Sequence, residues 1–563
     1  MIVSSEGTWQ AAAERKRAEV AKLLGPYTIP GDAIPPPAEL PDATNFPRAY
    51  LEPREIEFTE KLSIEELLGK LARREITAKE VTLAFCKRAA IAHQVTNCLS
   101  DVLFQQALAQ ADELDAYIAA HGKPIGRLHG LPVSWKDQIR VEGAETTVGY
   151  ISNLGRKETA KDEALLVKEL RELGAVIYAK TNVPTALMAI DTNNNIIGYT
   201  WNARNRLVSA GGSSGGEASL LAMKGSIIGF GTDIAASIRL PAAFQGLYGL
   251  KPSIGRLPWS KIAGSMEGQE LVSPVVGPMG HRVDDLEVIT KSILSTQPWL
   301  HDPTVVNMPW RQSETEAVAK HAKSGGLAFG VLRSDGIVLP HPPITRAIDE
   351  TVAKLKAHGH EVIEWEPPSH KEAFEIIWSL FVMDGGNDIH SSIGSSGEPV
   401  VPQIANIYGS SPGHLTPKTV NESWSYALRR NAYQTAYLEY WNSTASKTST
   451  GRAVDFFILP IAPTASYLPG QAIYPGYTGV INALDYTAIS VPVTTVDKAR
   501  DLAAADAGRQ RGEYLGEMDE QVWKQYDPNL FHGTPVGLQL VGRRLEEERV
   551  LAAAAELGRC LSE

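Results

Sequence analysis

The chain has 563 residues, of which 43% are hydrophobic and 21% charged, and its formal net charge is −11. These proportions are ordinary for a globular protein, and an acidic chain without a basic block does not predict a nucleic-acid partner. No apolar run approaches the roughly 18 residues that span a bilayer, so no integral membrane segment is expected.

Cysteine and histidine placement predicts neither disulfides nor a metal site. The three cysteines, Cys86, Cys98 and Cys560, form no C-x-x-C pair. No two histidines have the H-x-x-x-H spacing of a helical zinc site, and no dinucleotide fingerprint follows a strand. The N-terminus lacks the apolar core of a signal peptide. We therefore expect a cytoplasmic protein without a cofactor.

The first 58 residues predict an extension that precedes a single large domain over 59–563. A helix is expected over 8–24, followed by an irregular, proline-rich connector over 29–37. The domain boundary is therefore placed between the connector and the first helix of the large domain.

Helix and strand patterns alternate along the large domain. Ser63 and Thr77 each open a capping box before an apolar run, which predicts two helix starts. Further expected helices cover 107–120, 164–173, 345–358 and 546–557, and expected strands cover 131–135, 175–179, 327–332, 362–365, 456–459 and 536–541. This alternation predicts an α/β fold in which helices cover both faces of a central sheet.

A helical, aromatic-rich insert is expected at about residues 374–450. Tyr433, Tyr437, Tyr440 and Trp441 fall on one face of a helix in this insert. Such a stripe is typical of core packing, and the alternative is the wall of a substrate pocket.

Two serines lie in the glycine-rich run from Gly211 to Gly216, at Ser213 and Ser214. Glycine lets the backbone and both hydroxyls approach a ligand closely, and a helix-like segment follows at once. A flexible linker is the alternative. The run also matches the G-x-S-x-G nucleophile elbow, but the polar residues 202–206 before it do not predict the strand that an elbow requires.

A second run of small residues extends from Gly229 to Pro241 and contains Ser237. Small neighbours leave room for an acyl group, and proline suits the first turn of a helix. Ser237 is therefore expected near a helix N-terminus, where backbone N–H groups can stabilise an oxyanion. Asp233 and Arg239 are expected to form an ion pair that braces this loop.

Lys136 follows the apolar strand expected over 131–135. Burial lowers the pKa of a lysine, and a neutral amine can act as a base, whereas a surface lysine is the alternative. Nucleophilic catalysis needs a nucleophile, a neighbouring base and donors for the oxyanion. The two serine-containing runs and Lys136 can supply all three.

These segments resemble the amidase signature family. The resemblance rests on GLPVSWKDQI around Lys136, KTNVP at 180–184, GGSSGGEAS, GTDIAASIRLPA, GLYGLKPSIGRLP and the C-terminal TPVGLQLVGRR, and it covers residues 60–560. The N-terminal helix and connector are similar to the acetamidase and fatty-acid-amide-hydrolase-like branch. The resemblance implies the amidase signature fold, with a large mixed central sheet, and hydrolysis of a carboxylic amide.

The resemblance also implies a Ser–cis-Ser–Lys triad. Ser237 would be the nucleophile that forms the acyl-enzyme, and Ser213, which follows a cis peptide after Gly212, would relay its proton to Lys136. Ser214, Gly212, Asp233 and Arg239 would support this arrangement. The oxyanion hole would consist of the backbone N–H groups of Ile234, Ala235, Ala236 and Ser237.

One departure from the family concerns Ala235-Ala236, where the family usually has Gly-Gly. If the loop needs a positive φ there, the methyl groups strain or displace the oxyanion hole. Loss of one such donor typically costs about 3–4 kcal/mol in the transition state. The alternatives to an ordinary amidase are therefore a weakened amidase or an acyl-transfer, amidotransferase-type enzyme.

The substrate side is less defined by the sequence. Leu187 and Met188 match positions that line the acyl pocket of lipid-amide relatives, which favours an apolar acyl or aryl group, although local packing explains two apolar residues equally well. The expected partner is a small-molecule amide, and the resemblance suggests a homodimer.

Overall fold

The computed structural model describes residues 8–324, 326–501 and 513–563. Within these residues eleven strands form one sheet, in the order β1-β3-β2-β4-β6-β5-β10-β11-β9-β7-β8. Strand β2 pairs in parallel with β3 and β4, and β7 pairs in parallel with β8 and β9. The other pairs are antiparallel. The expected α/β fold with a large mixed sheet is confirmed.

The strands are β1 (Leu99–Val102), β2 (Pro132–Lys136), β3 (Val176–Thr181), β4 (Ile228–Asp233), β5 (Tyr248–Lys251), β6 (Val275–Gly280), β7 (Ala328–Val331), β8 (Glu361–Glu364), β9 (Phe456–Pro460), β10 (Ala488–Thr495) and β11 (Pro535–Val541).

The α-helices are α1 (Trp9–Leu24), α2 (Pro53–Ile56), α3 (Ile64–Ala72), α4 (Ala78–Thr96), α5 (Phe104–His121), α6 (Leu165–Glu172), α7 (Gly215–Ala222), α8 (Arg239–Gln245), α9 (Val283–Ser295), α10 (Gln312–Ser324), α11 (Pro342–Ala357), α12 (His370–Phe381), α13 (Asn387–Ser396), α14 (Pro402–Tyr408), α15 (Val420–Ser443), α16 (Gly476–Leu484), α18 (Glu517–Trp523) and α19 (Glu547–Ser562).

Local sequence signals explain several helix ends. Ser63 and Thr77 cap α3 and α4, and in both capping boxes the N3 glutamate bonds back to the backbone of the cap. Gly122 ends α5 in the left-handed conformation, which glycine adopts without strain. Helix α1 ends at Leu24, before Gly25-Pro26. These ends follow from residue chemistry alone.

Strand β4 has a sequence that predicts a strand poorly, because two of its six residues are glycines. It nevertheless runs fully buried between β2 and β6. A Cβ atom at Gly231 would lie 2.8 Å from Ser214 Oγ and 2.9 Å from Met279 Sδ. Glycine is therefore needed for the glycine-serine segment to pack onto this strand.

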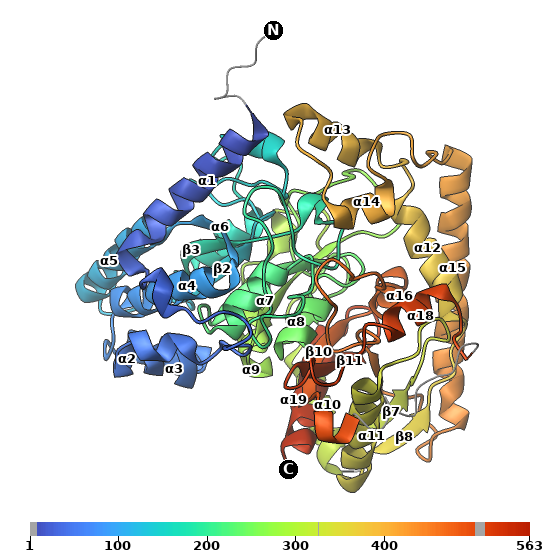
Figure 1. Ribbon diagram of the computed structural model, residues 1–563. Coiled ribbons are helices and arrows are strands. Elements are labelled where there is room, and N and C mark those ends of the chain that lie inside the picture. The colour runs from blue at the N-terminus through green and yellow to red at the C-terminus, as the bar shows by residue number, and fades with distance from the viewer. Residues whose placement is uncertain (1–7, 325, 502–512) are drawn as a thin grey trace.

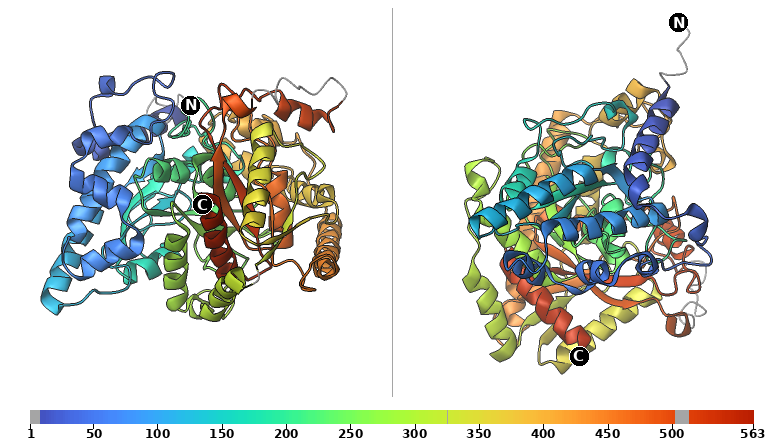
Figure 2. Two further views of the ribbon diagram at one scale, coloured as in Figure 1. Left: turned by 90° about the horizontal axis from the view of Figure 1, so that it is seen from below. Right: turned by 90° about the vertical axis from the view of Figure 1, so that its left-hand side faces the viewer.

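The helices gather in groups around the sheet (Figure 1). The N-terminal helices α1 to α5 lie on one side of the molecule, α12 to α15 lie on the opposite side, and α7 and α8 lie between them. Helix α8 packs on β5, β10 and β11, whereas α19 packs on β10 and against α9, α10 and α11. Figure 2 shows α19 running beside the strands of the C-terminal half.

The aromatic stripe of the insert belongs to the core. Tyr433, Tyr437 and Trp441 are buried on α15, and Trp441 packs edge-to-face on Trp365 with ring centroids 5.4 Å apart. None of the four stripe residues, including the half-buried Tyr440, lines either of the two cavities beside Ser237. The core-packing interpretation is the one that these positions support.

None of the helices in the described ranges combines the length and the apolar character needed to cross a lipid bilayer.

Candidate active site

The site forms where the parallel strands β2 and β4 end. Lys136 is the last residue of β2, and Thr232 and Asp233 are the last two residues of β4. Because the carboxyl ends of parallel neighbours meet at one edge of a sheet, these side chains come together. Ser213 approaches the same edge from the loop before α7, and its side chain is hydrogen-bonded to Lys136.

Lys136 is fully buried and has two hydroxyl partners. Its Nζ atom lies 2.7 Å from Ser213 Oγ and 2.7 Å from Thr232 Oγ1. Burial lowers the pKa of Lys136 to about 7, although the carboxylates of Asp233, Asp137 and Glu217 act in the opposite direction. A substantial fraction of the amine is therefore neutral near neutral pH, as a base requires. The alternative of a surface lysine is wrong.

The glycine-serine run is a tightly packed loop. Gly211 has a φ of +78°, and the Gly212–Ser213 peptide is cis. A Cβ atom at Gly212 would lie 2.7 Å from the backbone of Ala189 and Asp191, so no larger residue fits. These contacts are incompatible with a flexible linker. The residues directly before the run form no strand, so the nucleophile elbow is also excluded.

Ser237 lies in the loop that joins β4 to α8. The backbone N–H of Ser214 donates to the carbonyl of Ser237 at 3.2 Å, which ties the two serine-containing loops together. Among the described residues no hydrogen bond joins Ser237 Oγ to Ser213 Oγ; such bonds often form fully only with substrate bound. Both serines line the same cavity.

A buried ion pair holds the loop around Ser237. Arg239 and Asp233 are fully buried and their side chains meet at 2.9 Å. Asp233 also accepts from the backbone N–H of Ile238 at 3.1 Å and from Asn482 at 3.0 Å. The pair therefore fixes the first residues of α8 relative to the end of β4.

Ala235 and Ala236 occupy the loop without left-handed strain. Neither residue is among those with positive φ, and both are buried. The expectation that a positive φ would strain the oxyanion hole is therefore not met, and the main reason to consider a weakened or diverted enzyme falls away. Both residues belong to the lining of a cavity.

Two cavities meet at Ser237. One, of about 490 Å³, is bounded largely by the segment 252–276 and also by polar side chains that include Gln138, Arg140 and Ser213. The other, of about 450 Å³, is mainly apolar and, unlike the first, has no charged side chain among the described residues of its lining, which includes Ala235, Ala236, Trp378, Phe381, Ile407 and Ile473. Leu187 and Met188 line both cavities. The geometry therefore brings these two residues beside Ser237.

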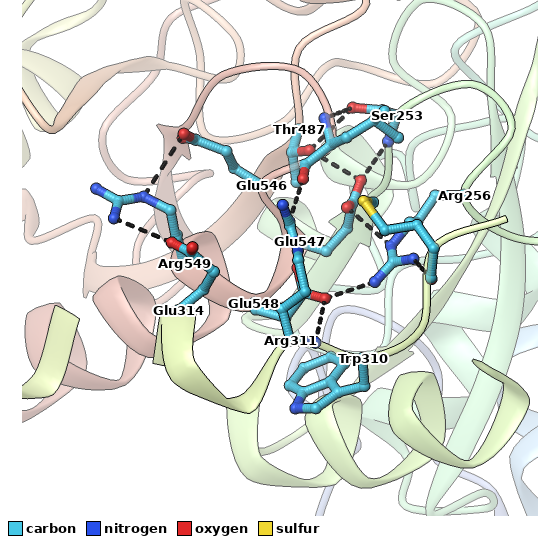
Figure 3. A network of polar contacts seen from close by, with 12 residues as sticks. Ser253, Arg256, Trp310, Arg311, Glu314, Thr487, Glu546, Glu547, Glu548 and Arg549 are labelled. Carbon is cyan, nitrogen blue, oxygen red and sulfur yellow. Dashed lines mark hydrogen bonds and ion pairs between the residues drawn. The ribbon is translucent and has the colours of Figure 1, made fainter. Parts of the chain in front are cut away.

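A buried ionic network supports the wall of the more polar cavity (Figure 3). Arg256 contacts Glu547 at 3.1 Å and Glu548 at 2.5 Å, and all three side chains are fully buried. Glu547 also accepts from the backbone N–H of Ser253, a wall residue, at 2.8 Å. The first turn of α19 thus anchors the wall segment 252–256.

Thr232 and Gln138 lie beside Lys136 and were not expected there from the sequence. Thr232 donates to Gln138 Oε1 at 2.6 Å and contacts Lys136, and all three side chains are buried. Gln138 follows Lys136 by two residues in the motif around the lysine, so its position was a usable signal. Thr232 lies in the glycine-rich strand β4, where no residue pattern marks it.

One group of side chains has the spacing of metal ligands, namely His360, Glu556 and Cys560. His360 Nδ1 accepts the backbone N–H of Leu327 at 3.0 Å, so in the neutral ring Nε2 carries the proton and points at Glu556. A protonated nitrogen cannot bind a metal. Within the described residues this group therefore fits a structural hydrogen-bond cluster.

Comparisons with known proteins agree with this geometry. The family model described as Amidase matches residues 80–551. The acetamidase of Emericella nidulans is 46% identical over 98% of both chains, and that of Aspergillus oryzae is 43% identical over 98% of this chain and 99% of its own. A solved fatty acid amide hydrolase superposes with a TM-score of 0.90 at 33% identity, covering 99% of this chain and 95% of its own.

A buried lysine, a serine on a cis peptide and a second serine at the junction of two cavities form an arrangement that suits a hydrolase acting through a serine. Because the sequence match extends over nearly the whole chain, the chain belongs to the amidase family. It is a serine-dependent amide hydrolase, an enzyme that cleaves linear amide C–N bonds.

Proposed function

We propose that Ser237 is the nucleophile of this amidase, with Ser213 as the relay and Lys136 as the base. The proposal rests on the 2.7 Å contact between the buried Lys136 amine and Ser213. Ser213 lies in the same cavity lining as Ser237, which is where the two cavities meet. A buried neutral amine can take a proton that a surface ammonium ion cannot.

The proposed reaction begins as Ser237 Oγ bonds to the amide carbon. Ser237 gives its proton to Ser213, which gives its own to the lone pair of Lys136. The amide C–N bond then breaks, and a proton returns through Ser213 to the leaving nitrogen. Water, activated by the same relay, hydrolyses the ester at Ser237 and frees the carboxylic acid.

The proposed oxyanion hole consists of the backbone N–H groups of residues 234–237. Within the described part of the chain, none of these four N–H groups donates a hydrogen bond to the protein. Ala235, Ala236 and Ser237 are buried, and buried donors normally have partners, so their free N–H groups beside a nucleophile favour a ligand oxygen. That ligand oxygen would be the carbonyl oxygen of the substrate, which develops a negative charge in the transition state.

The mainly apolar cavity favours an uncharged acyl group. Its 450 Å³ lies within the roughly 300–1,000 Å³ of pockets that hold drug-sized ligands, so it has room for more than an acetyl group. The two acetamidase relatives support acetamide as the smallest substrate. We propose that the enzyme hydrolyses amides with acyl groups from acetyl to medium aliphatic or aryl groups, and that the amine side lies toward the more polar cavity.

Labelling by an alkyl fluorophosphonate tests the nucleophile. We expect one adduct, at Ser237, located by peptide mass spectrometry, and none in Ser237→Ala. Lys136→Ala should slow labelling by at least about 100-fold, because a positioned base contributes roughly 10²–10⁴-fold. Labelling at another serine, or an unaffected rate in Lys136→Ala, would refute the assignment.

A substrate panel tests the acyl range. Hydrolysis of acetamide, butyramide, hexanamide and benzamide is followed by ammonia release, with Ser237→Ala as the blank. Hydrolysis of acetamide alone would contradict the proposed use of the apolar cavity, and no hydrolysis of any member would contradict the substrate class.

The family resemblance further supports a homodimer, and three unpaired, buried cysteines support a reducing, cytoplasmic compartment. Light scattering coupled to size-exclusion chromatography tests whether the protein is a dimer. Fractionation of cells that produce the protein tests whether it lies in the cytoplasm.

A further inference from the structure

Lys136 can act as a base only if its lone pair faces Ser213, and something must fix that orientation. A neutral amine has two N–H bonds and one lone pair, and the two neighbours of Nζ are both hydroxyls, at 2.7 Å each. A hydroxyl can donate or accept. If Thr232 donated to the lone pair, Lys136 would be left to donate to Ser213, and the relay would point the wrong way.

The structure fixes the direction of the Thr232 hydroxyl through Gln138. Gln138 Nε2 donates to the backbone carbonyl of Ala263 at 2.6 Å, and a carbonyl can only accept. The amide oxygen of Gln138 therefore faces Thr232, where it accepts from Oγ1 at 2.6 Å. Since its one proton is used there, Thr232 offers Lys136 only a lone pair, so Lys136 must donate an N–H to Thr232.

The side chains of this hydrogen-bonded chain, Gln138, Thr232 and Lys136, are all buried. Gln138, Thr232 and Lys136 are each 4% exposed or less, so these bonds are largely removed from bulk solvent. Hydrogen bonds in such a low-dielectric setting reinforce one another. When Lys136 accepts a proton, the ammonium ion still donates to Thr232, so the arrangement serves both states of the base.

The Ala263 end of this series of hydrogen bonds belongs to the segment that forms the wall of the more polar cavity. Ala263 also donates its N–H to the carbonyl of Gln138 at 3.0 Å, and Ile262 forms an antiparallel bridge with Ile139. Residues next to Ala263, such as Gly264 and Ser265, line the cavity. The position of this wall segment is therefore linked to the orientation of the Lys136 amine.

We propose that Gln138 is a positioning residue of this amidase: through Thr232, its amide turns the lone pair of Lys136 toward Ser213. This inference rests on the proposed role of Lys136 as the base. It assigns to Gln138 no contact with substrate and no proton transfer.

The test measures the rate of fluorophosphonate labelling at Ser237 between pH 5 and 9, in the full-length protein. This reaction has no leaving amine to protonate, so it reports activation of the serine. We expect Gln138→Leu to lower the rate roughly 10- to 100-fold, less than loss of the base itself. Gln138→Glu should shift the pH midpoint upward by a unit or more, because a carboxylate there favours the ammonium form.

Thr232 provides a second pair of variants. Thr232→Val removes the hydroxyl at nearly constant volume and should match Gln138→Leu, whereas Thr232→Ser should restore most of the rate. Because both side chains act through one chain of bonds, the double variant Gln138→Leu/Thr232→Val should be no slower than the slower single variant. Additive losses in the double variant would contradict the proposal.

Gln110→Leu is the matched control, because Gln110 also donates to a backbone carbonyl, that of Ala175, outside the site. Its labelling rate and midpoint should equal those of the wild type. Gln138→Leu and Thr232→Val with wild-type rates and midpoints would overturn the positioning role while leaving the proposed function intact. Wild-type labelling rates in Lys136→Ala would instead remove the proposed function. If Gln138→Leu does not fold, the Thr232 pair decides alone.

Discussion

At the scale of single residues, the proposed chemistry depends on taking one ammonium group, that of Lys136, out of water. Lys136 is fully buried and its pKa falls to about 7 because desolvation penalises the charged form. The charged groups that act on it are the carboxylates of Asp233, Asp137 and Glu217. The protonation state of Lys136 therefore sets the pH range in which the proposed base can work.

A pH profile follows from this pKa. Below about 7 Lys136 is an ammonium ion without a lone pair, so we expect kcat/KM for amide hydrolysis to rise with pH and level off above a midpoint near 7. Burial also raises the pKa of Glu217 to about 7, so Glu217→Gln serves as the control. If Lys136 governs the profile, Glu217→Gln keeps the transition, and its pH midpoint is slightly lower. A flat profile from pH 5 to 9 would contradict the assignment.

Ala235 and Ala236 should influence acyl selectivity, since both residues belong to the lining of the apolar cavity. Ala236→Val should lower kcat/KM for benzamide relative to acetamide by roughly 10- to 200-fold, the usual range for one or two added carbons in an apolar pocket. Ala236→Gly should change this ratio much less. Because acetamide is an internal standard, equal losses on both substrates would mean damage to the oxyanion hole instead.

At the scale of elements, the first turn of α19 supports the cavity wall through Arg256. Removing one partner of a buried ion pair leaves the other charge unpaired, at a cost of about 3–5 kcal/mol. We therefore expect Arg256→Met to lower the melting temperature measured by calorimetry and to raise KM more than it lowers kcat. Arg333→Met, which breaks an exposed pair with Asp349, is the control and should leave both nearly unchanged. A melting temperature equal to the wild type in Arg256→Met would count against this role.

At the scale of the whole molecule, helix α1 is joined to the sheet by a buried charge. Lys16 is 3% exposed and contacts Asp101 at 3.1 Å and Glu145 at 3.0 Å. The carboxylates hold the pKa of Lys16 above its usual value despite burial. We expect the N-terminal segment to be an integral part of the fold for this reason, although residues 1–58 are separate in sequence character.

Lys16→Met tests this expectation. Two buried carboxylates would lose their partner, so the free energy of unfolding in urea should fall by about 3–5 kcal/mol. Lys22→Met, an exposed lysine of the same helix, should have almost no effect. If both variants unfold at the same urea concentration as the wild type, α1 contributes little to the stability of the domain.

The sequence by itself determined the class of fold and the triad candidates. Alternating apolar strands and capped helices depend on local chemistry, as at Ser63 and Thr77, so their signals survive in the chain. The motifs around Lys136, Ser213 and Ser237 are short and contiguous, so they carried the family resemblance. Strand β4 was not predicted, because its glycines are explained only by what packs on them.

Only the tertiary structure decided how these segments act together. It placed Lys136 out of water and brought Gln138 and Thr232 into one hydrogen-bonded chain from segments 94 residues apart. It also showed that Ala235-Ala236 needs no positive φ and that the aromatic stripe serves the core. Burial, hydrogen-bond direction and cavity shape arise from contacts between distant segments, which no local pattern of residues records.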